Sequence, residues 1–128
     1  MVAWADYKAA AKERGSLAHE LYVVTSTPAK SPDEVKAVLP EHLAYQQQLE
    51  ARGALAFAGP LSDETGEQMQ GTGMIVYRAA SLSAARQLAD ADPMHQQQAR
   101  TYTLRRWLIN EGSLQLGLRL SAQSVTLE

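Results

Sequence analysis

The chain has no cysteine, no long apolar run and no excess of charge of either sign. Without cysteine it cannot form disulfides, a thiolate nucleophile or a cysteine-ligated metal site. Its 12 basic and 14 acidic residues give a net charge of −2 with no block of like charge, which argues against nucleic-acid binding. No run reaches membrane-spanning length, and charged residues interrupt the N-terminal segment 1–15, as they would not in a signal peptide. We therefore expect a cytoplasmic protein with no nucleic-acid or membrane partner.

The length and apolar content predict one domain. A chain of 128 residues that is 45% hydrophobic can form a single core, and we assign it as one domain over residues 1–128. The core of this domain is expected at about 17–112. A helical arm precedes it at 1–16, and alternating leucines predict a strand extension within 113–128.

Periodicity and turn residues predict an α+β core. Strands are expected at Glu20–Thr25, Ala54–Ala58, Thr72–Arg78 and Ala99–Ile109, with Gly59-Pro60 ending the second and a long loop before the third. The first helix ends at Gly53 and begins either at Ser31-Pro32 or afresh at Pro40; the second is capped by Ser81 or Ser83 and ends at Ala91. This β-α-β-β-α-β order predicts the ferredoxin-like fold, with two helices on one face of a four-stranded antiparallel sheet.

Two of the strands are apolar on both faces. In Leu21–Val24 and in Met74–Tyr77, both alternating sets of side chains are apolar. Two helices can cover only one face of a sheet, so the second face needs a partner. The simplest partner is a second copy of the chain, and we expect a homodimer.

His42 falls on the apolar face of the first helix. At the helical period it lies within about 60° of Val35, Val38, Tyr45 and Leu49. One interpretation is a core histidine that is satisfied by a backbone carbonyl. The other is a proton-transfer residue, because an imidazole held by a carboxylate is suited to act as a general base near neutral pH.

Asp92 is the candidate carboxylate. Followed by Pro93, it is also a good N-cap for a short helix over Pro93–Gln98, and the two roles are compatible. A metal site made of His42, Asp92 and His95 is an alternative, but mixed His and Asp triplets arise by chance and we expect no metal. Arg100, Arg105 and Arg106 are expected to face solvent, with binding of an anionic substrate group as the alternative.

The order of several short motifs resembles the YCII-related (YciI-like) family. These motifs are His42-Leu43, Gly59-Pro60-Leu61 after the Gly53 turn, and Ala89-Asp90-Ala91-Asp92-Pro93, within Leu21–Gly112. The resemblance implies a dimeric α/β barrel of two ferredoxin-like protomers with a His and Asp pair, by position His42 and Asp92. The clearest activity in the family is dehydrochlorination of a chlorinated hydroxyquinol. Muconolactone isomerases and small cofactor-free monooxygenases share the fold. Gln96–Gln98 stand where the family often has a glycine.

Two functional hypotheses follow. The preferred one is a cofactor-independent lyase or isomerase that uses His42 and Asp92 for acid/base catalysis on a small aromatic or lactone-like substrate. The alternative is a non-catalytic dimeric module that binds a small ligand. In either case the pocket is expected to include Gly59, Pro60, His95 and Trp107, and no metal or organic cofactor.

Overall fold

The computed structural model describes residues 1–128, which form two compact units. The larger unit is Glu20–Trp107, and the smaller one combines Met1–His19 with Leu108–Glu128. None of the helices is both long and apolar enough to cross a membrane.

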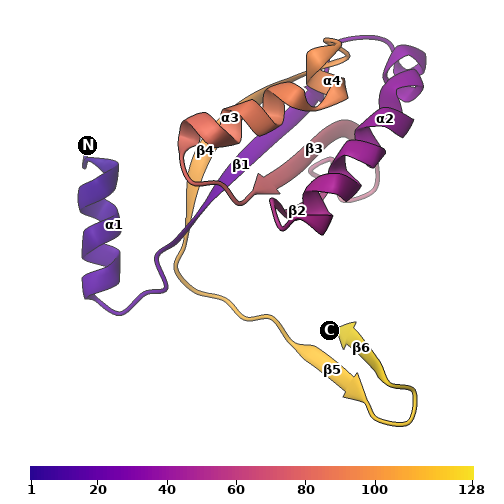
Figure 1. The fold of residues 1–128 in the computed structure, drawn as a ribbon. Helices are drawn as coiled ribbons and strands as arrows, with labels where there is room; N and C mark the ends of the chain where they lie inside the picture. Colours follow the sequence, from indigo (N-terminus) through magenta and orange to yellow (C-terminus); the bar gives the residue numbers. More distant parts are fainter. The chain divides into compact units, whose positions relative to one another are not determined.

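A four-stranded antiparallel sheet forms the larger unit, as the sequence predicts (Figure 1). Its order is β2-β3-β1-β4, and its strands are β1 (His19–Pro28), β2 (Leu55–Ser62), β3 (Met69–Tyr77) and β4 (Arg100–Ile109). Strand β3 pairs antiparallel with both β1 and β2. At one end of the pair β1 and β4, the Ala29 N–H donates to the Ala99 carbonyl at 2.9 Å. The two edges of the sheet are therefore β2 and β4.

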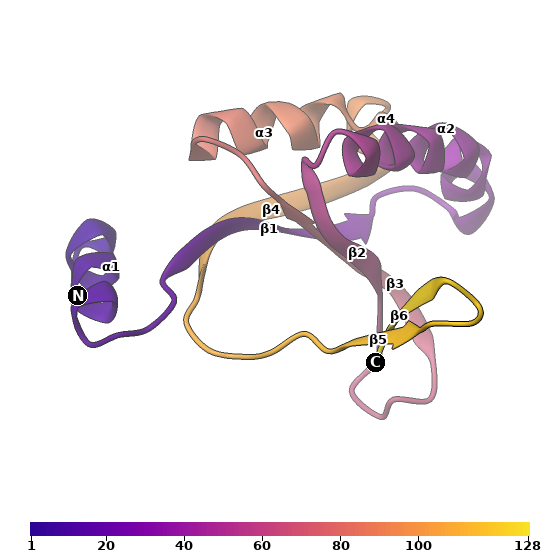
Figure 2. The same cartoon turned by 60° about the horizontal axis from the view of Figure 1, so that its bottom comes forward.

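The helices of the larger unit cover one face of the sheet (Figure 2). They are α2 (Pro32–Ala51), α3 (Leu82–Ala91) and α4 (Pro93–Gln96). The Ser31 hydroxyl accepts the Glu34 N–H at 3.3 Å, so α2 begins at the earlier of the two expected positions. It continues through Pro40, which has no N–H to donate within the helix. Ser81, rather than Ser83, caps α3 by accepting the Ala84 N–H at 3.0 Å.

The core lies between the helices and the sheet. Its buried residues are Tyr22, Val24, Leu49, Ile75, Tyr77, Ala85 and Ala89. Tyr22 pairs with Tyr77 and Val24 with Ile75, so neighbouring strands present these side chains to the same face. A second cluster joins Val38 of α2 to Met94 of α4. Burial of one such side chain contributes about 1.5–3 kcal/mol, and this second cluster fixes α4 beside α2.

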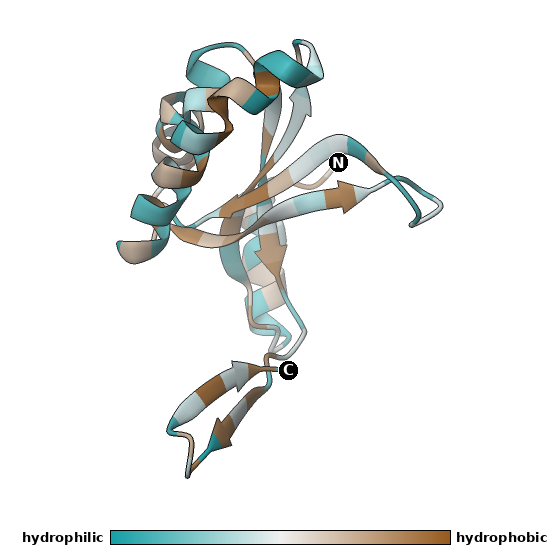
Figure 3. Ribbon diagram, turned by 90° about the vertical axis from the view of Figure 1, so that its right-hand side faces the viewer, coloured by the Kyte–Doolittle hydropathy of each residue, from teal (hydrophilic) through white to brown (hydrophobic).

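The other face of the sheet also carries apolar side chains. Apolar residues recur along the strands, as the brown segments in Figure 3 show, and those that alternate with the core residues point to this other face. Val76 stands opposite Val23 on one side and opposite Phe57 on the other. Phe57 is 49% exposed. The expected homodimer stays a prediction, and this face is the surface on which it rests.

Strand β2 runs past the point where the sequence predicts its end. It continues through Gly59 and Pro60 to Ser62, and β3 begins already at Met69. Proline is tolerated on an edge strand because a missing N–H interrupts no ladder on the open side. The register shifts between Pro60 and Ser62, which is typical of a β-bulge.

The smaller unit contains α1 (Trp4–Glu13), β5 (Leu116–Arg119) and β6 (Ser124–Leu127). Ala11, Ala18 and Leu108 form its buried cluster, with Trp4 packed against them. Strands β5 and β6 pair antiparallel with each other. The sequence predicts a strand near β5, but not its pairing with β6.

Candidate active site

His42 and Asp92 lie in direct contact. His42 projects from α2, and Asp92 stands at the junction of α3 and α4. Both carboxylate oxygens of Asp92 are 2.8 Å from His42 Nδ1. An ionised carboxylate only accepts hydrogen bonds, so Nδ1 carries the hydrogen and Nε2 keeps its lone pair in the neutral ring. No residue of the protein bonds Nε2.

Asp92 also caps α4. Its Oδ1 accepts the Met94 N–H at 2.9 Å, and Pro93 fills the first helical position, where no N–H is needed. The side chain of Asp92 is fully buried, whereas that of His42 is 15% exposed. The cap fixes the carboxylate on one side, so its free lone pairs are directed at His42. The two interpretations of Asp92 are thus compatible in the structure.

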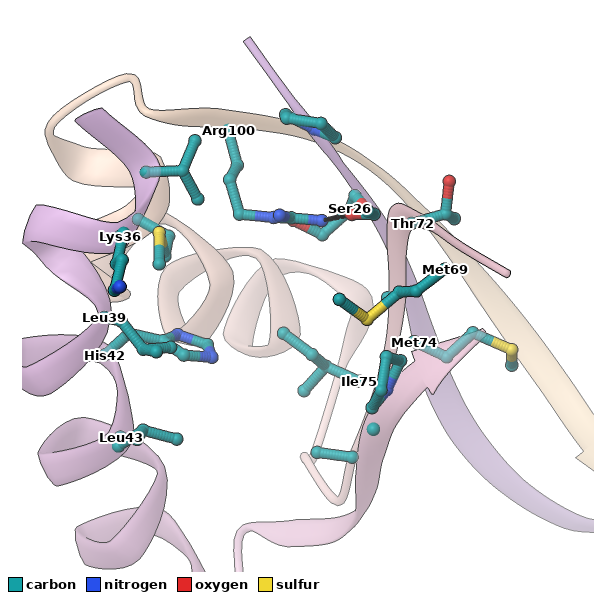
Figure 4. A pocket seen from close by; sticks show the side chains of 18 of the residues that line it. Ser26, Lys36, Leu39, His42, Leu43, Met69, Thr72, Met74, Ile75 and Arg100 are labelled. Atoms are coloured by element: carbon teal, nitrogen blue, oxygen red, sulfur yellow. Dashed lines mark hydrogen bonds between the residues drawn. The ribbon is translucent and has the colours of Figure 1, made fainter. Parts of the chain in front are cut away.

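A cavity of about 740 Å³ adjoins the His42 ring. Helix α2 forms one wall and strands β2 and β3 the opposite wall, as Figure 4 shows for Leu39, His42 and Ile75. Gly59 and Pro60 line it, in the part of β2 that the sequence analysis assigns to a turn. Most of the lining is apolar. This volume is in the range of small-molecule sites in proteins.

Two residues that the sequence analysis assigns to the pocket, His95 and Trp107, are not among those lining this cavity. The His95 ring lies 4.6 Å from the Tyr102 ring, centroid to centroid, and both its nitrogens have protein partners. Trp107 is an odd number of positions from Tyr102, whose side chain packs on the core, so strand alternation turns it to the opposite face. No group of three His, Cys, Asp or Glu side chains is placed to hold a metal ion.

The comparisons with known proteins agree with this architecture. The sequence profile of the YCII-related domain matches residues 20–108. The chain belongs to the YCII-related domain family.

A solved structure with a similar fold is that of 5-chloro-2-hydroxyhydroquinone dehydrochlorinase from Burkholderia phenoliruptrix AC1100, in complex with 2,5-dihydroxybenzoquinone. The two sequences are 19% identical, the similarity covers 68% of this chain and 92% of that one, and the TM-score is 0.50. At this identity the likeness shows a shared fold. No curated protein matches the sequence.

In the structure Arg100 lines the cavity. The sequence favours a solvent-facing position for this residue, so that expectation is wrong. Arg100 Nε donates to Ser26 Oγ at 2.9 Å, and Nη2 donates to the Ser26 carbonyl at 2.8 Å and to the Gly71 carbonyl. Burial lowers the pKa of Arg100, while the negative charge of Asp92 raises it. The sequence alone could have placed Arg100 on the inner face of β4, because Arg100 is two positions before Tyr102 and residues two apart in a strand share a face.

Two tyrosines stand near Asp92 in this YCII-related site. The Tyr45 hydroxyl donates to the Leu88 carbonyl at 2.7 Å, whereas the buried Tyr77 hydroxyl has no hydrogen-bond partner. Burial raises the pKa of both phenols, and the negative charge of Asp92 raises them further. Both tyrosines therefore stay neutral across the physiological range, and neither places a negative charge beside His42.

Proposed function

We propose that this YCII-related chain is a small-molecule lyase or isomerase in which His42 transfers protons. The observation that carries the proposal is the contact of His42 Nδ1 with Asp92, which leaves Nε2 as a proton acceptor on the wall of a 740 Å³ cavity. Asp92 stabilises the imidazolium that forms when Nε2 takes a proton, as the aspartate does in hydrolytic triads.

The chemistry is that of a base that takes a proton and returns it. In the dehydrochlorination of a hydroxyquinol, two hydroxyl protons leave oxygen, one proton is added to the chlorine-bearing carbon, and chloride departs, so that HCl is lost. In the isomerisation of a lactone, one proton leaves one carbon and another is added elsewhere. Both reactions require one group that alternates between base and acid, which is the role assigned to His42.

The proposal includes a homodimer and a role in the cytoplasm. The face carrying Val23 and the exposed Phe57 supports the dimer, because each protomer supplies the same apolar surface and a two-fold axis can pair them. The small aromatic or lactone-like substrate is supported by the mostly apolar cavity.

The experiment measures turnover of two probes by the purified chain. Chloride release from 5-chloro-2-hydroxyhydroquinone reports elimination, and deuterium incorporation into muconolactone in D2O reports isomerisation. The variant His42→Gln is compared with His19→Gln, the same substitution at an exposed histidine in the smaller unit. We expect turnover of one probe, its loss in His42→Gln and its retention in His19→Gln. Saturable binding without turnover would assign the non-catalytic binding module instead, and unchanged turnover in His42→Gln would remove His42 from the mechanism.

A further inference from the structure

The cavity carries positive charge with no negative charge on its lining. Lys30, Lys36 and Arg100 line it, and no aspartate or glutamate does. Asp92 lies behind His42, fully buried, with its oxygens committed to His42 and to the cap of α4. An apolar cavity that presents several cations attracts an anionic ligand.

Arg100 is a partly buried cation that forms no ion pair. The protein acceptors of its guanidinium are all neutral oxygens, those of Ser26 and Gly71, and no carboxylate forms an ion pair with it. Its Nη1 group has no protein partner. A partly buried guanidinium in this state gains strongly from a carboxylate, because a charge-assisted pair replaces the lost hydration.

A chain of hydrogen bonds positions Arg100. His95 Nδ1 donates to the Ala89 carbonyl at 2.8 Å, so in the neutral ring Nε2 is left as an acceptor. Ser26 Oγ is 2.9 Å from this Nε2 and 2.9 Å from Arg100 Nε. The Ser26 hydroxyl therefore donates to His95 and accepts from Arg100. His95 and Ser26 are positioning residues, which accounts for a histidine that the proton transfer does not use.

Lys36 supplies a second free cation. It projects from α2, the helix that carries His42, and Figure 4 shows it beside Leu39 on the wall facing the cavity. No hydrogen bond or ion pair holds its ammonium group, whereas Lys30 donates to the Gln97 carbonyl at 3.2 Å. Lys36 is thus available to a ligand that also reaches Arg100.

We propose that the cavity binds its ligand through a carboxylate group, held by Arg100 and Lys36, with the rest of a small aromatic molecule on the apolar lining toward His42. This deepens the proposed function, since the carboxylate site and the proton acceptor belong to one cavity. The substrate class is then an aromatic or lactone-like carboxylic acid.

The test compares two probes that differ in one charge, 2,5-dihydroxybenzoate and 2,5-dihydroxybenzamide, by isothermal titration calorimetry. We expect the full-length chain to bind the carboxylate about 10-fold to 100-fold more tightly than the amide, as one charge-assisted bond allows. In Arg100→Gln this preference should fall to the several-fold that Lys36 contributes. Arg105→Gln is the matched control, because Arg105 is exposed on the same strand and does not line the cavity.

A second variant keeps the test decisive if Arg100→Gln folds poorly. Lys36 is exposed, so Lys36→Met should fold normally and weaken carboxylate binding several-fold without changing amide binding. Equal affinities in the wild type, binding of neither probe, or an intact preference in both variants would overturn the proposal. His42→Gln should keep the carboxylate preference while losing turnover. The carboxylate site and the proton-transfer function therefore fail by different measurements.

Discussion

Asp92 binds His42 with the same carboxylate that caps α4. Its two oxygens are 2.8 Å from His42 Nδ1, and one of them also accepts the Met94 N–H at 2.9 Å. Asp92, which caps the start of α4, therefore also orients the imidazole ring of His42, which belongs to α2. Because α4 is also packed against α2 through Met94 and Val38, the cap, the packing and the pair support one another.

Asp92→Asn should separate the cap from the charge. Asparagine is as good an N-cap as aspartate, so we expect a folded protein with a thermal midpoint within a few degrees of wild type. Activity should fall by about 10³-fold to 10⁴-fold, as when the aspartate of a hydrolytic triad is changed to asparagine. The measurements are thermal unfolding and kcat/KM for the probe that the wild type turns over. Equal kcat/KM in the two proteins would show that the carboxylate serves the helix alone.

Tyr77→Phe should stabilise the protein or leave its stability unchanged. The Tyr77 hydroxyl is buried without a partner, and an unsatisfied buried group of this kind costs about 1–3 kcal/mol. The matched control is Tyr45→Phe, which removes the bond to the Leu88 carbonyl and should destabilise by about 1 kcal/mol. Urea unfolding of both variants gives the comparison. A loss of stability in Tyr77→Phe as large as that in Tyr45→Phe would indicate that the Tyr77 hydroxyl has a partner.

The raised pKa of Tyr77 predicts that the protein loses stability at alkaline pH. Burial raises the pKa of Tyr77 above its usual value of about 10, so above that pH the unfolded chain loses a proton that the folded chain retains. The free energy of unfolding therefore falls as the pH rises through this range. In Tyr77→Phe the decline should be shallower than in wild type. Parallel pH profiles for the two proteins, measured by urea unfolding, would contradict the assignment.

Phe57→Lys should dissociate the homodimer that we propose. Phe57 is 49% exposed beside Val76, so a lysine there costs the protomer little and places a charge at the expected interface. Light scattering should give a dimer mass for wild type and a monomer mass for the variant. Ala44→Lys, on an exposed position of α2, is the control and should remain dimeric. A monomeric wild type at micromolar concentration would remove the barrel.

Much of the core follows from the sequence because local signals and packing agree there. His42 shares its helix face with Val38 and Leu49, and the structure buries both of these residues. Ser31-Pro32 is a strong helix start, whereas Pro40 is an ambiguous one, since the surrounding packing decides whether a helix tolerates proline. The extent of β2 beyond Gly59 was not predictable, because only the sheet order shows that β2 is an edge strand.

The carboxylate site required three-dimensional information. Arg100 could have been placed on the inner face from its spacing to Tyr102, but its bonds to Ser26 join positions 74 residues apart. Lys36 lies on a helix whose exposed face carries other charges, so its place at the cavity depends on the opposite wall formed by β3. Long-range strand pairing of this kind leaves no local signature in a single sequence.

The tautomer of His42 tests the central claim most directly, and it needs no substrate. Nitrogen-15 NMR of the neutral ring distinguishes the nitrogen that carries hydrogen from the one that keeps its lone pair. We predict hydrogen on Nδ1 and a lone pair on Nε2 in the wild type. In Asp92→Asn the asparagine oxygen still accepts the Met94 N–H, and the amide nitrogen faces His42 Nδ1. That amide donates a hydrogen bond, so in this variant we predict the lone pair on Nδ1 and the hydrogen on Nε2. Hydrogen on Nε2 of the wild-type ring would contradict the account, because His42 then has no acceptor directed at the cavity.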